Sequence, residues 1–133
     1  MPFVEQLILC TRVEDDPSGM LNLQGFLGAP FMTDGPGHLE RVTCVAVLSG
    51  MKNVSEYSVE IQLLCDDNLI AKTRAMPLQL NALEAEDHHI HRSVISPVLI
   101  ARAGTYTFRL LLRFSTGDQL SCSQNMVVQF ATS

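Results

Sequence analysis

Residues 56–65 read Glu-Tyr-Ser-Val-Glu-Ile-Gln-Leu-Leu-Cys, and this stretch decides the fold class. Its apolar residues occupy the odd positions, namely Tyr57, Val59, Ile61, Leu63 and Cys65. Side chains alternate between the two faces of a β-strand, so an apolar residue at every second position predicts a half-buried strand. A helix would spread the same residues around its circumference.

The same alternation returns in residues 105–114, where one face carries Tyr106, Phe108, Leu110, Leu112 and Phe114. Other apolar segments of strand length are residues 4–13, 20–27, 41–49 and 120–130, with weaker signals at 69–76 and 89–95. Turn-forming Asp, Asn, Gly and Pro residues separate most of these segments. The pattern predicts an all-β protein in which about eight antiparallel strands form two sheets packed face to face.

Two segments interrupt this rhythm. Residues 28–38 are rich in Gly and Pro, which predicts a long surface loop. Residues 77–87 contain Asn81 followed three residues later by Glu84, a pattern typical of a helix start, so we expect at most one short helix here. We found neither a linker nor an internal repeat, and 133 residues suffice for one core, so we expect a single domain over residues 1–133.

Charge and cysteine content limit the possible classes of function. Nine Lys and Arg residues against 14 Asp and Glu residues give a net charge of -5, and the basic residues are scattered, which argues against a nucleic-acid surface. The sequence shows neither a signal peptide nor a membrane span, so we expect a cytoplasmic protein without a membrane partner. The four cysteines, Cys10, Cys44, Cys65 and Cys122, lie far apart in apolar stretches, which predicts buried free thiols.

The run Gly104-Thr105-Tyr106-Thr107-Phe108 resembles the motif that opens strand F of immunoglobulin-like domains. The resemblance implies an immunoglobulin-like β-sandwich in which the Tyr106 hydroxyl ties its strand to the preceding corner. Phe108 stands where antibody domains have a disulfide cysteine, and the chain has no Trp, so an antibody-type domain is excluded.

The order of elements also resembles a family of short bacterial β-sandwich proteins of unknown function. The segments that carry this resemblance are Leu7-Ile8-Leu9-Cys10, Gly19-Met20-Leu21-Asn22-Leu23-Gln24-Gly25, residues 57–63 and residues 104–108. The resemblance implies the fold; it implies no activity, cofactor or site.

The run Glu84-Ala85-Glu86-Asp87-His88-His89-Ile90-His91 is the strongest candidate for chemistry. In an extended chain, His89 and His91 point the same way, about 6 to 7 Å apart. Together with Glu86 they could hold zinc, nickel or copper. A solvated polar edge strand explains the same residues. We interpret His38, in the glycine-rich loop, as a loop residue rather than a ligand.

Catalytic motifs are absent from the sequence. It contains neither a G-x-S-x-G nucleophile motif nor a glycine-rich phosphate loop, and apolar surroundings would raise the pKa of each cysteine. We therefore expect a protein that is not an enzyme and carries no cofactor.

Apolar residues on the second face of some strands point to association. The segment 41–49 carries Val45 and Val47 opposite its main apolar face, and the segment 4–13 carries Leu7 and Leu9 on a second face. Either the chain itself or a second subunit covers these residues. We expect a homodimer through a sheet face, with Phe31 and Met32 of the long loop as further contacts.

The sequence therefore predicts a non-catalytic binding or assembly module that self-associates or binds a protein partner. One alternative is a metal-binding protein or metal-dependent enzyme that uses residues 84–91. The other is a structural subunit of a larger particle, such as a phage tail.

Overall fold

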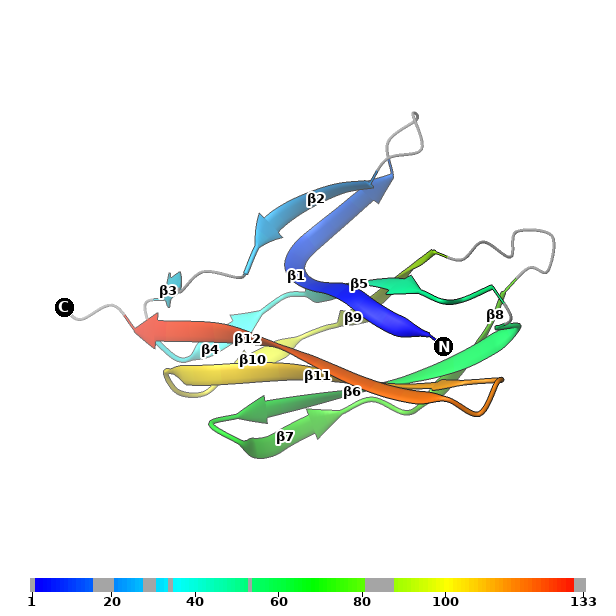
Figure 1. Ribbon diagram of the computed structural model, residues 1–133. Helices are drawn as coiled ribbons and strands as arrows, with labels where there is room; N and C mark the ends of the chain where they lie inside the picture. The colour runs from blue at the N-terminus through cyan, green and yellow to red at the C-terminus, as the bar shows by residue number, and fades with distance from the viewer. Residues whose placement is uncertain are drawn as a thin grey trace.

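The computed structural model describes residues 2–15, 21–27, 31–33, 35–52, 54–80 and 88–130 (Figure 1). All regular elements in these ranges are strands, and none of them is a helix. The all-β prediction is therefore confirmed, and most strand pairs are antiparallel, as expected.

Two large sheets and one small sheet make up the fold. The first sheet has the order β2-β1-β5-β9, formed by β1 (Phe3–Asp15), β2 (Leu21–Phe26), β5 (Val42–Ser49) and β9 (His89–Ile95). The second has the order β3-β12-β11-β6-β7, formed by β3 (Phe31–Thr33), β6 (Glu56–Cys65), β7 (Asn68–Lys72), β11 (Gly104–Phe114) and β12 (Gln119–Phe130). Strand β8 (Met76–Gln79) also pairs with β6, and β4 (Gly37–Leu39) pairs with β10 (Val98–Ile100).

The structure has more strands than the eight that we predicted. The segment 28–38 contains β3 and the start of β4, because distant strands pair with both. Strand β3 pairs with β12 in parallel, and β4 pairs with β10. Residues 69–76 contribute to two strands, β7 and β8. Residues 77–79 belong to β8 rather than to a helix, and residues 81–87 lie outside the described residues.

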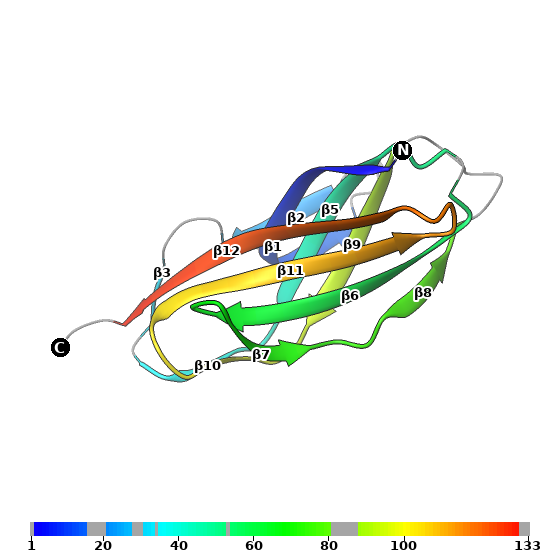
Figure 2. The same ribbon diagram turned by 60° about the horizontal axis from the view of Figure 1, so that its bottom comes forward.

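The core lies between the two large sheets. Strand β5 contributes Val42, Cys44, Ala46 and Leu48, and β6 and β11 contribute the alternating residues that the sequence placed on one face. Phe108, Leu110 and Leu112 are completely buried. On one side of the sandwich, β1 and β12 lie against each other, and this contact closes the core there (Figure 2).

The corner before β11 has the arrangement implied for Tyr106. Its hydroxyl donates a hydrogen bond to the Arg102 carbonyl at 2.7 Å. Next to it, the Thr105 amide donates to Asp66 Oδ1 at 3.0 Å. Gly104 has a φ of +153°, and a Cβ atom there would lie 2.6 Å from Asp66 Oδ2, so this close approach requires glycine.

The cysteine prediction also agrees with the structure. All four are free; Cys10, Cys44 and Cys65 are buried and Cys122 is partly buried. Burial, with a smaller contribution from Cys10 and Cys122, raises the pKa of Cys44 to about 12. At neutral pH this thiol is protonated and therefore a poor nucleophile.

We expect Tyr106→Phe to lower the free energy of unfolding by about 1 kcal/mol, because it leaves the Arg102 carbonyl without this donor. Urea denaturation at neutral pH measures the change. Thr107→Val is the control: it removes a hydroxyl from the exposed hydrogen bond to Asn125 and should cost less. Equal stability of Tyr106→Phe and the parent protein would show that the corner contributes nothing.

Candidate functional site: the open edge of the sandwich

A tyrosine hydroxyl connects the two sheets where β9 faces β6. The Tyr57 hydroxyl lies 2.9 Å from His89 Nε2 and 2.9 Å from His91 Nδ1. Both imidazole rings approach the tyrosine ring edge-on, and the centroid of each imidazole lies 5.5 Å from the centroid of the tyrosine ring. A hydroxyl can donate one hydrogen bond and accept another, so two neutral histidines satisfy Tyr57 completely.

Local pairing explains why both histidines face the interior. In the register of β5 and β9, His89 pairs with Leu48 and His91 pairs with Ala46, and both partners are fully buried. Paired residues of neighbouring strands lie on the same face of a sheet. His91 is itself buried, and its Nε2 atom is hydrogen-bonded to Ser93 Oγ.

Burial keeps the two histidines neutral. It lowers the pKa of His89, and it lowers the pKa of His91 to about 4, with a smaller effect from the nearby His89. Burial also raises the pKa of Tyr57 to about 12. At neutral pH the cluster therefore carries no charge, which is the state that a buried hydrogen-bonded network favours.

The geometry does not fit the metal site predicted from the sequence. The His89 and His91 nitrogens that converge are both bonded to Tyr57, and the second nitrogen of His91 is bonded to Ser93. Glu86 lies outside the described residues. Within the described part of the chain, no group of three or more His, Cys, Asp or Glu residues could hold a metal ion. His88 instead bonds to Ser49 Oγ through Nδ1 at 2.8 Å.

The hydrogen bond between Ser93 and His91 has the arrangement of a nucleophile and its base. However, a tyrosine hydroxyl rather than a carboxylate holds the second nitrogen of His91. A base with a pKa of about 4 removes a serine proton poorly at neutral pH. The arrangement therefore favours a structural role, which is to fix β9 against β6.

The position of β9 leaves one side of the sandwich open. Strand β9 is the last strand of the first sheet and faces β6, but the second sheet continues past β6 with β7 and β8. The two views agree that these strands lie at the side of the molecule away from the contact between β1 and β12 (Figures 1 and 2). We call this side, bounded by β9 and β10 in one layer and by β6, β7 and β8 in the other, the open edge.

Core-facing apolar residues are exposed at the open edge. Leu78 pairs with Tyr57, Met76 pairs with Val59, and Ala71 pairs with Leu63. Each therefore lies on the same face as a buried core residue. Yet Ala71 and Leu78 are exposed, and Met76 is 66% exposed. Strand β9 of the first sheet lines a hollow together with Met76 and Leu78, but it leaves both side chains exposed.

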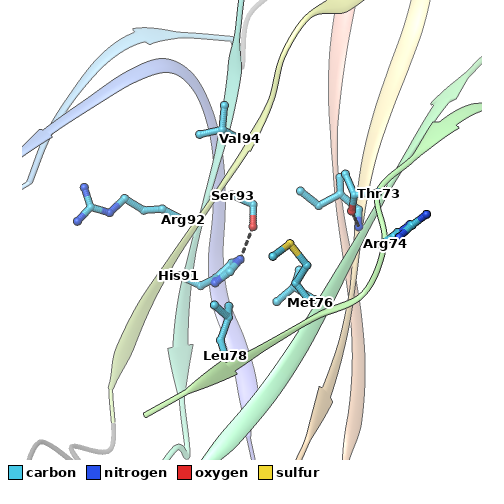
Figure 3. Close-up of a pocket in the computed structure, with 10 residues that line it drawn as sticks. Thr73, Arg74, Met76, Leu78, His91, Arg92, Ser93 and Val94 are labelled. Carbon is cyan, nitrogen blue, oxygen red and sulfur yellow. Dashed lines mark hydrogen bonds between the residues drawn. The ribbon is translucent and has the colours of Figure 1, made fainter. Parts of the chain in front are cut away.

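A hollow of about 270 Å³ occupies this uncovered region, and we call it the Met76 hollow. Its walls include Val59 and Ile61 of β6, Met76 and Leu78 of β8, and His91 and Ser93 of β9. Figure 3 shows Met76 pointing toward the hydrogen-bonded pair of His91 and Ser93. The arginines Arg74 and Arg92 also line the hollow and extend to opposite sides of it (Figure 3).

A second hollow continues along the same edge. It measures about 350 Å³ and lies between β6, β7 and the segment that leads from β9 through β10. We call it the Leu99 hollow; its lining includes Leu63, Ile70, Ala71, Pro97, Leu99 and Tyr106. Arg102 also lines it and makes a 3.4 Å ion pair with Asp66.

Two of the residues predicted for a sheet-face interface are buried within the chain. Leu9 and Val45 are each 2% exposed, so the chain itself covers them, while Leu7 and Val47 are partly buried. Leu7 and Leu9 pair with Ala46 and Cys44, and thus face the core rather than a second subunit. The side chains of Phe31 and Met32 lie outside the described residues. His38 is an exposed residue of β4, as expected.

Sequence reasoning missed Tyr57 and Ser93 as partners of the histidines, and it missed the exposed row on β7 and β8. The alternation correctly placed Tyr57 on the inner face. It gave no signal that β9 would lie opposite β6.

Comparison with known proteins does not assign the chain to a family. No model of a known protein family matches the chain, and no curated protein matches it. In the described residues, no helix has the length and apolar character needed to cross a membrane.

The neutral state of His91 predicts that acid destabilises the fold. Because the pKa of His91 is lower in the folded chain than its ordinary value of 6.5, the unfolded chain binds the proton first. The stability from this residue is complete above about pH 6.5 and falls by about 3 kcal/mol as the pH drops to about 4.

Urea denaturation of the parent protein and of His91→Asn, at about pH 7.5 and about pH 4, tests this expectation. Carboxylates titrate in both proteins, so the difference between their pH dependences isolates His91. The parent protein should lose more stability in acid than the variant. Identical pH dependences would contradict a buried, neutral His91.

Proposed function

We propose that this chain is a non-catalytic binding or assembly module and that the open edge is its binding surface. The exposed, core-facing row formed by Ala71, Met76 and Leu78 is the observation that carries this proposal. These side chains have the orientation of core residues but stay exposed. Covering them with a partner would remove apolar surface from water, and full burial of a large apolar side chain contributes about 1.5 to 3 kcal/mol.

Other exposed apolar residues support the same surface. Ile70, Val94 and Leu99 are large, exposed and part of the lining of the two hollows. Together with Met76 and Leu78, they line the two hollows from β7, β8, β9 and β10. Extended apolar surfaces of this kind mark binding sites more often than scattered single residues do.

The metal-binding alternative receives less support. Its two histidines bond to Tyr57, and burial lowers the pKa of both. A structural subunit of a larger particle remains compatible with the open edge, because a neighbouring subunit is one kind of protein partner.

We also propose that the fold is immunoglobulin-like. The hydrogen bond from Tyr106 to Arg102 supports this assignment, since it has the form of the tyrosine corner found in such domains. Two mainly antiparallel sheets packed over a shared core support it as well.

A displayed library of random peptides of about twelve residues tests the binding function, because such a peptide spans the length of β9. We expect selection to enrich peptides with apolar residues at alternating positions. Fluorescence anisotropy of a labelled, selected peptide then gives its Kd. Met76→Asp, which places a charge on the exposed row, should weaken binding at least about tenfold.

Leu69→Asp is the matched control. Leu69 is 53% exposed on β7, but it pairs with Leu64 rather than with an inward-facing residue of β6, so its loss should leave the Kd unchanged. Thermal unfolding of both variants checks that each is folded. Failure to enrich any peptide, or an equal loss of affinity in the two variants, would contradict the proposed function.

A further inference from the structure

Among the described strands, β9 is the last one of the first sheet at the open edge. Strand β9 pairs with β5 along one side, and β6 faces it across the core. A further strand beside β9 would continue the first sheet and would lie over β7 and β8. The exposed row of Ala71, Met76 and Leu78 is the surface that such a strand would cover.

The edge of β9 is suited to accept a strand. It is seven residues long, and its pairing with β5 runs without a register shift. Natural edges are usually protected by short length, lysine, proline or a bulge. Strand β8 is short and contains Pro77, and β7 carries Lys72 and pairs with β6 across a bulge at Leu63 and Leu64. Among the described residues, β9 has neither proline nor bulge, and it exposes Ile90 and Val94.

The charges around the two hollows indicate the chemistry of the occupant. Arg102 of the Leu99 hollow is already paired with Asp66, but the Met76 hollow is lined by Arg74 and has no Asp or Glu among its described lining residues. This is the reverse of the whole chain, in which acidic residues outnumber basic ones by 14 to 9. A segment that carries a carboxylate therefore complements the edge.

The same charges argue against a second copy of this chain. In a symmetric pair, the same edge would meet itself, so that each copy would bring Arg74 to the shared surface, and the described lining of the Met76 hollow adds no carboxylate. A different protein that supplies a carboxylate avoids this repulsion.

We propose that the open edge binds an extended segment of another protein, which adds to β9 as a fifth strand of the first sheet. Alternate apolar side chains of that segment cover Met76 and Leu78, and an acidic side chain faces Arg74. This inference rests on the proposed binding function and specifies the partner and its mode of binding. Backbone hydrogen bonds to β9 give affinity, while the two hollows and the arginine select the side chains.

Backbone methylation of the selected peptide tests the strand pairing. In an added strand, the amides of alternate residues point toward β9 and those of the remaining residues point away. We would synthesise two versions of the peptide, each N-methylated at one of these two alternating sets. One version should bind at least about tenfold more weakly, because it loses several hydrogen bonds to β9, while the other keeps its affinity.

Charge reversal tests the role of Arg74. Arg74→Glu should weaken the binding of the acidic peptide about threefold or more. A peptide with lysine in place of its acidic residue should bind this variant better than it binds the parent protein. Arg113→Glu is the matched control: Arg113 is exposed on β11, away from both hollows, and the same change of charge there should have no effect.

The outcomes separate the two proposals. Equal loss of affinity for both methylated peptides would overturn strand addition but leave the binding function intact. Selection of no peptide at all would overturn both. Light scattering that shows a dimer, together with its dissociation by Met76→Asp but not by Leu69→Asp, would overturn the assignment to a different protein, because the second copy would then be the occupant.

Discussion

The hydrogen bonds that the Tyr57 hydroxyl shares with His89 and His91 fix how the two sheets are aligned, and the rest of the structure depends on this alignment. They bring β9, the last strand of one sheet, over β6, which is an inner strand of the other. An apolar contact allows the sheets to shift, but a hydroxyl hydrogen-bonded to a buried and a partly buried imidazole has one satisfactory position. The polar cluster thus sets the position of one sheet relative to the other across the apolar core.

This alignment makes the two sides of the sandwich different. On one side β1 meets β12, and the core is closed. On the other side, apolar side chains of β7 and β8 that share a face with core residues stay exposed. In the function that we propose, the histidine-rich segment contributes to the binding surface by placing an edge strand. The structural cluster and the proposed partner surface then share the same strand.

Local periodicity predicted the parts of the fold that depend on one strand and its inner face. It identified the buried faces of β6 and β11, and the resemblance of residues 104–108 to strand F indicated the role of Tyr106. It could not show which strand lies opposite which, because alternation records only that a face is covered. For that reason Leu9 and Val45 were assigned to an interface although the chain buries them, and Met76 was not recognised as exposed. Residues 31–33 and 37–39 form strands only because distant partners pair with them, which a Gly- and Pro-rich sequence does not reveal.

Nuclear magnetic resonance of the Tyr57 side chain tests the alignment most directly. Nuclear Overhauser effects should connect the Tyr57 ring protons to the imidazole protons of both His89 and His91, whose ring centroids lie 5.5 Å away. Nitrogen chemical shifts should show the His91 imidazole neutral near pH 6, since burial lowers its pKa to about 4. If Tyr57 shows no nuclear Overhauser effect to either histidine, or if His91 is charged at that pH, then β9 does not lie against β6 in this way. The open edge would then lose its structural basis.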